Sequence, residues 1–213
     1  MVVVLGSGGH TAEMMLLLRD VDPRRYIHRT YNVSSGDTFS SGKAVEIERT
    51  IQAKHVQFFS EPSKAGVVHA ITGTWDLIIV PRAREIHQPL YTTPLSSLWS
   101  LIGCLRALYT TYTTSRAAPD EYPDIIITNG PATAVMVVLA AIILKQLALA
   151  PAHKMKTIYV ESWARVKTLS LSGKLLLWTG ICDTFLVQWE SLAKKINGTR
   201  ARRRVEWKGS FVE

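Results

Sequence analysis

The sequence predicts an α/β protein with a doubly wound, mostly parallel sheet. Short apolar runs rich in Val and Ile alternate with longer stretches of helical periodicity along most of the chain. Parallel strands that are buried on both faces have this composition, and alternating strands and helices are typical of βαβ units. In an open sheet of this kind, a ligand binds in the crevice beyond the carboxyl ends of the strands.

The expected elements follow one another in a regular order. The first strand is Val2–Leu5, and a helix follows over residues 11–18. Further strands are expected at 25–33, 55–60, 76–81, 124–131, 156–160 and 183–189, and further helices at 41–54, 95–112, 132–150, 170–181 and 190–196. The signal is weak over 61–75, and the proline-interrupted stretch 115–123 is expected to be a loop.

The turn after the first strand is rich in glycine. It reads GSGGH and comprises Gly6, Ser7, Gly8, Gly9 and His10. Glycines let backbone N–H groups approach a ligand closely, and the helix N-terminus favours an anion, so a phosphate or sugar phosphate is the natural ligand. Packing alone is the other explanation of such a turn.

Two common nucleotide signatures are incomplete at this turn. A dinucleotide fingerprint needs a third glycine where this chain has Thr11, and no Walker lysine follows the loop. A purely structural turn gives no reason for a histidine at its mouth. His10 is therefore a candidate general base or a hydrogen-bond partner of a diphosphate.

Other polar turns also follow expected strands. They are PRARE, which begins at Pro81, NGP, which begins at Asn129, and ESWAR, which begins at Glu161. Because the carboxyl ends of parallel strands meet at one edge of the sheet, these turns are expected to gather with GSGGH around one cleft.

Size and composition are consistent with one domain over residues 1–213. The chain has a formal net charge of +8 and is 47% hydrophobic. The charge indicates an anionic partner, for which nucleic acid, a phosphorylated substrate and an anionic membrane all qualify. The C-terminal segment, about 197–213, is basic and is either a solvated tail or a contact for lipid headgroups. Cys104 and Cys182 are expected to be reduced core thiols.

Two expected helices raise the question of a membrane. The run Ala132–Ala150 is long and apolar, but Lys145 interrupts it between two strands, which favours a buried crossover helix over a membrane span. The helix over 95–112 either packs on the core or lies on a bilayer with an apolar face that includes Trp99, Leu101 and Leu105.

Five motifs in order resemble one known family. GSGGHTAEM, PRAREI, TNGP, YVESWARV and DTFLVQW, at these separations, resemble the asparagine-linked glycosylation protein 14 family from about Val2 to the C-terminus. A more distant similarity is to the N-terminal half of the bacterial peptidoglycan N-acetylglucosaminyltransferase, a two-domain GT-B enzyme. The resemblance implies a Rossmann-like sheet of the kind found in the N-terminal half of a GT-B glycosyltransferase.

This resemblance also implies an activity and partners. Family members are the acceptor-binding, membrane-recruiting subunit of the inverting transferase that adds the second GlcNAc to dolichyl-diphosphate-GlcNAc. A separate catalytic subunit of the asparagine-linked glycosylation protein 13 family mainly binds the donor, UDP-GlcNAc, and activity needs both chains. The implied location is the cytosolic face of the endoplasmic reticulum membrane, and the nuclear envelope is a further candidate. No nucleic acid partner, no cofactor and no metal held by this chain are implied, although a divalent ion can accompany UDP.

Site roles are carried over residue by residue from the matching motifs. His10 is the preferred base for the attacking 4-hydroxyl of GlcNAc, and Glu161 is either an alternative base or a partner of His10. Arg165 can pair with Glu161 in a purely structural way. The residues expected to bind acceptor sugar or diphosphate are Gly6, Ser7, Gly8, Gly9, Thr11, Arg82, Arg84, Glu85, Asn129, Gly130, Ser162 and Arg165.

The chain departs from the family pattern in two places. Ala132 and Ala134 stand where the family commonly has Gly and Cys. Family members usually carry a membrane helix ahead of the first strand, which Met1 directly precedes here, so the helix over 95–112 is expected to make more of the membrane contact. EWKGSFVE, with Trp207 and Phe211, is either part of the partner interface or a terminal packing strand.

The sequence is also compatible with two other functions. One is a non-catalytic module that only recruits the catalytic partner to the membrane. The other is a nucleotide-dependent oxidoreductase with a degenerate glycine-rich loop.

Overall fold

The structure is a computed structural model that describes residues 1–56, 72–84, 88–89, 91–114, 121–130, 132–199 and 205–209. Its strands are β1 (Val2–Leu5), β2 (His28–Ser34), β3 (Thr74–Val80), β4 (Ile125–Asn129), β5 (Lys156–Val160), β6 (Thr184–Val187) and β7 (Glu206–Trp207). Its helices are α1 (Gly9–Leu18), α2 (Thr38–Val56), α4 (Thr93–Thr114), α5 (Ala132–Gln146), α6 (Leu171–Thr179) and α7 (Glu190–Thr199).

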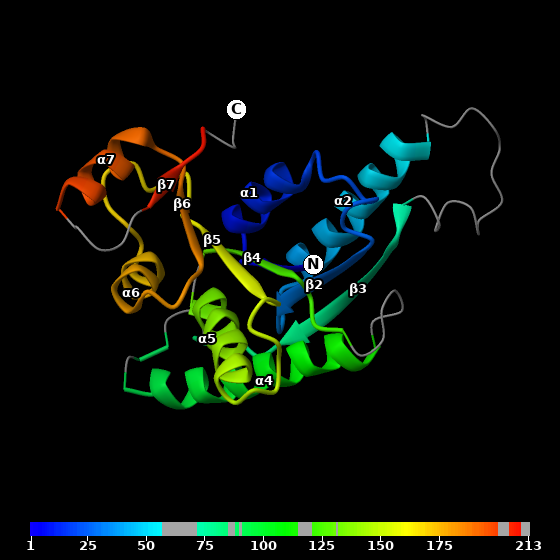
Figure 1. Cartoon of the computed structure of the whole chain (residues 1–213), viewed down its shortest axis with the longest axis horizontal. Coiled ribbons are helices and arrows are strands. Elements are labelled where there is room, and N and C mark those ends of the chain that lie inside the picture. The colour runs from blue at the N-terminus through cyan, green and yellow to red at the C-terminus, as the bar shows by residue number, and fades with distance from the viewer. Residues whose placement is uncertain are drawn as a thin grey trace.

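The seven strands form one sheet in the order β3-β2-β1-β4-β5-β6-β7, and every neighbouring pair is parallel. Figure 1 shows α1 and α2 on one side of this sheet and α4 and α5 on the other. The chain winds outward from β1 to β3 and then returns to β4 on the far side of β1. The expected doubly wound, parallel α/β fold is therefore confirmed.

The side chains of β1 alternate between the two faces of the sheet, and both faces are apolar, which explains why this strand lies at the centre. Val3 and Leu5 pack into a core with α1 and α2. Val2 and Val4 point to the opposite face and pack into a core with α4 and α5. A four-residue strand that is apolar on both faces is buried between two helical layers, as the sequence predicted.

A buried ion pair ties β2 to α2. The guanidinium of Arg29 donates to both carboxylate oxygens of Glu48, from Nε at 2.6 Å and from a terminal nitrogen at 2.7 Å. The hydroxyl of Tyr31 also donates to Glu48, at 2.6 Å. Burial and the Glu48 carboxylate raise the pKa of Tyr31, so its hydroxyl stays protonated. The paired groups satisfy one another, which is what allows a charged pair to remain in this core.

The apolar surface of α4 differs in part from the expectation. Trp99 is 60% exposed, whereas Leu101 and Leu105 pack against the buried core of α4 and α5. The exposed apolar side chains of α4 include Leu95, Leu98 and Trp99. Of the two alternatives left open for this face, core packing therefore holds for Leu101 and Leu105, whereas Trp99 remains on the surface.

The α5 helix has the expected role of a buried crossover. It connects β4 to β5, and most of its apolar side chains are buried. Among the described helices, none combines the length and the hydropathy required to span a bilayer. Cys104 and Cys182 are free thiols, as expected.

One expected strand cannot be evaluated. Residues 55 and 56 of the predicted strand 55–60 belong to the end of α2, and the remainder lies outside the described residues. The sequence RARRR, from residue 200 to 204, also lies outside them.

Candidate functional site

The carboxyl edge of the sheet brings the sequence motifs together. Because β1, β4 and β5 are neighbours, the turns that follow them lie side by side: GSGGH after β1, Asn129–Gly130 after β4 and Glu161–Ser162 after β5. The winding direction reverses between β1 and β4. This is the topological switch point at which open α/β sheets bind their ligands.

The glycine-rich turn is open to solvent. Ser7, Gly8 and Gly9 are exposed, and a Cβ built on either glycine meets no other atom within 4 Å. Gly8 has φ 63°, a left-handed conformation that disfavours other residues, and its carbonyl accepts from the amide of Thr11 at 3.1 Å. The amides of Gly9 and His10 precede the first hydrogen bond of α1 and have no acceptor within the helix, so this exposed turn can offer N–H groups to an anion.

Thr11 supports this turn from beneath. Its side chain is fully buried, and its hydroxyl donates to the carbonyl of Gly6 and lies 2.6 Å from Ser40 Oγ. Ser40 in turn donates to the carboxylate of Asp37 at 2.8 Å. Protein encloses the Thr11 hydroxyl, which in this structure supports the loop that Gly6 begins; its expected contact with a substrate stays a prediction.

Asn129 bridges the ring of His10 and the carboxylate of Glu13. His10 Nδ1 lies 3.0 Å from Asn129 Oδ1, and Asn129 Nδ2 donates to Glu13 Oε2 at 2.8 Å. Glu13 Oε2 is also 3.9 Å from His10 Nδ1. Gly130 packs against the imidazole. The predicted residues His10, Asn129 and Gly130 are thus assembled in one cluster.

Glu13 joins this cluster to the β5 turn, and sequence reasoning missed it. Its second oxygen, Oε1, accepts from Ser162 Oγ at 2.8 Å and from the amide of Trp163 at 3.2 Å. The carboxylate therefore connects α1 with the turns after β4 and β5. The signal in the sequence was the spacing, because Glu13 lies three residues after His10 and so on the same face of the helix.

Electrostatic interactions couple the His10 imidazole and the Glu13 carboxylate. The nearby Glu13 carboxylate raises the pKa of His10, against the opposing effect of burial. Burial alone would raise the pKa of Glu13, but the interactions with His10, Asn129 and Ser162 outweigh it and lower this pKa. Glu13 is consequently a carboxylate at neutral pH, and His10 titrates above its ordinary range.

Glu161 faces away from the cluster. It is 1% exposed, and its Oε2 accepts from both the amide of Ser170 at 2.9 Å and the Ser170 hydroxyl at 3.0 Å. Its Oε1 accepts from the amide of Ser162 at 3.1 Å. Arg165 is exposed, and among the described ion pairs none joins it to Glu161. The alternative of a structural pair between these two residues is therefore not seen in this structure, in which Ser170 and Ser162 donate to the carboxylate.

The turn that contains Arg82 and Arg84 follows β3, which is an edge strand of the sheet. Arg82 donates to the carbonyl of Ser35 at 2.8 Å, and Arg84 donates to the carbonyl of Gln88 at 3.0 Å. Within the described part of the chain, no hydrogen bond or ion pair joins either arginine to His10 or its partners. Glu85 lies outside the described residues.

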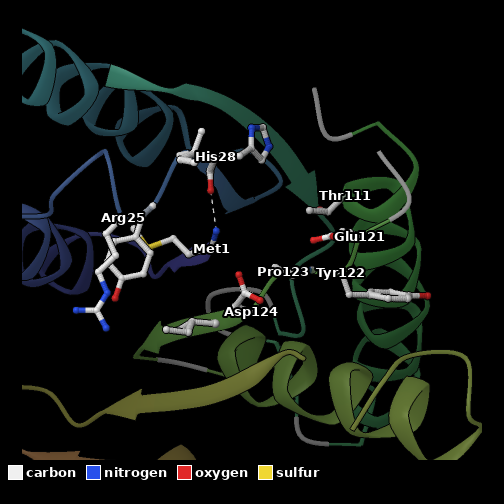
Figure 2. Close-up of a pocket in the computed structure, with 11 residues that line it drawn as sticks. Met1, Arg25, His28, Thr111, Glu121, Tyr122, Pro123 and Asp124 are labelled. Carbon is white, nitrogen blue, oxygen red and sulfur yellow. Dashed lines mark hydrogen bonds between the residues drawn. The ribbon is translucent and has the colours of Figure 1, made fainter. Parts of the chain in front are cut away.

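A cavity of about 210 Å³ lies at the amino ends of the strands, which is the end of the sheet opposite the His10 cluster. Figure 2 shows Met1, His28 and Asp124 around it, with the Met1 amine donating to the His28 carbonyl at 2.6 Å. These residues precede or begin β1, β2 and β4, so the cavity opens at the amino ends of the strands. It is separated from the His10 cluster by the height of the sheet and does not belong to that site.

The fold and the site define a class of protein. It is a doubly wound α/β protein whose glycine-rich turn can accept an anion beside a histidine that is held by hydrogen bonds and can take up a proton. The family model described as "Oligosaccharide biosynthesis protein Alg14 like" matches residues 1–205. This chain belongs to the Alg14 family.

Curated relatives agree with this assignment. The UDP-N-acetylglucosamine transferase subunit alg14 of Aspergillus fumigatus is 40% identical, over 93% of this chain and 99% of the relative. The protein of the same name from Schizosaccharomyces pombe is 37% identical, over 92% of this chain and 78% of the relative. The ALG14 subunit of Mus musculus is 31% identical, over 92% and 77%. No solved structure matches.

Proposed function

We propose that this chain is the acceptor-binding subunit of a UDP-N-acetylglucosamine transferase that adds the second GlcNAc to GlcNAc-diphospho-dolichol. The donor, UDP-GlcNAc, is bound mainly by a partner of the asparagine-linked glycosylation protein 13 family. Membership of the Alg14 family and the names of the relatives support a transferase subunit. The doubly wound fold is compatible with one half of a GT-B enzyme, which would need a second half for activity.

The observation that carries the catalytic part of this proposal is the position of His10. It stands beside the open glycine-rich turn, and Asn129 holds its Nδ1. About a third of its side chain, 32%, is exposed. An imidazole held at one nitrogen and accessible to solvent can meet a substrate hydroxyl with the other nitrogen.

The reaction is an inverting displacement. His10 Nε2 takes the proton from the 4-hydroxyl of the acceptor GlcNAc while that oxygen bonds to C1 of the donor GlcNAc. The bond from C1 to the β-phosphate oxygen breaks, and UDP leaves with the electron pair. Inversion at C1 follows from attack on the face opposite UDP. The partner subunit supplies the surroundings of the leaving group.

The glycine-rich turn is suited to the diphosphate of the acceptor. The exposed backbone of Gly8 and Gly9 and the N-terminus of α1 offer N–H groups and a positive dipole end, and the first turn of α1 carries no acidic residue. Binding there would place the sugar that follows the diphosphate next to His10.

Two helices offer a surface for the membrane. We define the helical apolar patch as the exposed residues Leu95, Leu98 and Trp99 of α4 and Leu171, Leu175 and Trp178 of α6. Both helices pack on α5, and α4, α5 and α6 contain no Asp or Glu. Exposed cations, Arg106 and Lys174, occur on the same two helices. Apolar and aromatic side chains with cations and no carboxylates fit the headgroup region of an anionic bilayer. We propose that this patch contributes to recruitment of the complex to the endoplasmic reticulum, on the cytosolic face.

Reconstitution tests the proposal. Transfer of labelled GlcNAc from UDP-GlcNAc to a lipid-diphosphate-GlcNAc acceptor is measured with this chain alone, the partner alone and the two mixed, with membrane supplied. We expect product only in the mixture, and NMR of the product should show the β-anomer. No product in the mixture, with both proteins folded, or product with retained configuration would contradict it.

A matched pair of variants separates catalysis from pure recruitment. His10→Ala should lower turnover of the complex by roughly 100-fold to 10,000-fold, the usual contribution of a general base. His153→Ala makes the same change at an exposed histidine before β5, and turnover should not change. If His10→Ala retains activity and partner binding, this chain is a recruitment module that contributes no base.

A further inference from the structure

The side-chain amide of Asn129 has an orientation that its neighbours determine. An amide offers an NH₂ donor on one side and an oxygen acceptor on the other, whereas an ionised carboxylate can only accept. The atom of Asn129 that lies 2.8 Å from Glu13 Oε2 must therefore be the nitrogen, Nδ2. The opposite atom, Oδ1, then faces His10 Nδ1 at 3.0 Å.

The imidazole of His10 is constrained in the same way. An amide oxygen can only accept, so the ring nitrogen that faces it must carry the proton. Neutral His10 is consequently the Nδ1–H tautomer, and its lone pair is on Nε2. This is the tautomer that the proposed proton transfer needs, because Nε2 must be free to accept.

Glu13 is itself fixed in place. Its other oxygen accepts from Ser162 Oγ at 2.8 Å and from the amide of Trp163 at 3.2 Å, so the carboxylate cannot rotate away without losing both bonds. Its side chain is 14% exposed. Among the described residues, the carboxylates that influence the charge of His10 are Glu13 from its own helix and, at longer range, Glu161, which is turned toward Ser170.

We propose that Glu13 is a positioning residue that acts through Asn129 to hold His10 in the Nδ1–H tautomer, with Nε2 available as the base. This inference rests on the proposed function of His10 and adds the residue that prepares it. When Nε2 takes the acceptor proton, the resulting imidazolium lies beside the Glu13 carboxylate, 3.9 Å from Nδ1, and is stabilised by it. Asn129 thereby acquires a different role from the sugar ligand that the sequence suggested.

The substitution Glu13→Gln makes the proposal testable. The oxygen of the introduced amide can keep the bonds from Ser162 and Trp163, but the NH₂ group of that amide would then face Asn129. Asn129 would have to turn its oxygen toward this NH₂ group and its own NH₂ toward His10 Nδ1, which would become an acceptor. The proton would move to Nε2 and block the base.

The experiment uses the reconstituted complex with this chain in full, with ¹⁵N-labelled histidine. Two-bond ¹H–¹⁵N correlation spectra of the imidazoles assign the His10 tautomer through the resonances missing from His10→Ala. We expect Nδ1–H in the unaltered chain and Nε2–H in Glu13→Gln. We also expect kcat to fall by roughly 100-fold or more while KM for the acceptor changes little, because the loss concerns proton transfer.

Controls separate positioning from a general loss of structure. Glu46→Gln removes an exposed carboxylate of α2 that pairs with Lys43, so tautomer and kcat should stay unchanged. If Glu13→Gln unfolds, the tautomer of the unaltered chain still decides: Nε2–H there would overturn the inference. Unchanged tautomer and unchanged kcat in folded Glu13→Gln would also overturn it. Activity retained by His10→Ala would instead overturn the proposed base itself, so the two failures are distinguishable.

Discussion

Gly130 lies directly against the imidazole of His10. A Cβ added to Gly130 would be 2.7 Å from His10 Cγ and 3.0 Å from its Cβ, closer than such atoms approach in proteins. Gly130 also has φ 91°, a conformation that side chains rarely adopt. The glycine of the NGP motif is therefore required both by the turn and by the ring beside it.

Gly130→Ala should displace the His10 ring from Asn129. Misplacement of a catalytic group by about 1 Å can cost on the order of 100-fold in rate, so we expect a kcat loss of roughly that size. The measurement is GlcNAc transfer by the reconstituted complex, together with thermal unfolding of the variant. Gly42→Ala is the matched control, because a Cβ there meets nothing within 4 Å and α2 adopts ordinary helical angles. Full activity of Gly130→Ala would show that the ring position is not critical.

The pH dependence of transfer should reflect His10. A general base works only after it loses its proton, so kcat/KM should rise with pH and level off above the pKa of His10. Because the interaction with Glu13 raises this pKa above the ordinary 6.5, the midpoint should lie on the alkaline side of that value. In Glu13→Gln the midpoint should move to lower pH, since the neighbouring negative charge is gone. A midpoint below 6.5 in the unaltered complex would argue against His10 as the titrating base.

Glu161 is expected to stabilise the fold and not to act as the base. Its carboxylate accepts three hydrogen bonds and is 1% exposed, and the missing side chain of Gly173 leaves room for it at the start of α6. Glu161→Gln puts an NH₂ group against donors, so we expect a loss of about 1.5–3 kcal/mol in unfolding free energy. Urea unfolding measures that loss, and kcat assayed where the variant is fully folded should change only a few-fold. A large loss of kcat at unchanged stability would return the role of base to Glu161.

The sequence was informative about the framework for a physical reason. Parallel strands such as Val2–Leu5 are buried on both faces and therefore appear as short, continuous apolar runs, and turns at their carboxyl ends must share one edge of the sheet. His10, Asn129 and Ser162 could therefore be placed together from the sequence, and the structure confirms this. The sequence could not supply the sheet order, which depends on where the chain returns after β3.

The assignments of individual side chains were less predictable. Glu161 and Thr11 are polar residues in the right turns, but whether such a side chain faces the cleft or the protein depends on partners distant in sequence, here Ser170 and Ser40. Glu13 was overlooked because it lies within a helix and follows no strand. Its spacing from His10 would have placed it on the same helical face, but its contacts with Asn129 and Ser162 require the folded sheet.

The helical apolar patch leads to a last prediction, on membrane binding. Leu95, Leu171 and Trp178 are 76%, 81% and 72% exposed, so inserting them into the headgroup region would remove much apolar surface from water. Half-burial of such side chains is worth roughly 1 kcal/mol each. Replacement of the three by Ser should therefore weaken binding to vesicles that contain anionic lipid by about 100-fold, as measured by co-flotation of the full chain.

A matched variant and a change of lipid identify what causes the binding. Leu16 and Phe39 are exposed apolar residues of α1 and α2, in the helical layer on the opposite face of the sheet, and their replacement by Ser should leave flotation unchanged.

Arg106→Ser and Lys174→Ser should weaken binding to anionic vesicles but have little effect with zwitterionic ones, because these cations are attracted to headgroup charge. If the patch variant floats like the unaltered chain, another surface contacts the bilayer. Since α4 and α6 pack on α5 on the face of the sheet away from α1, loss of binding only in the patch variant would fix how the chain is oriented on the membrane.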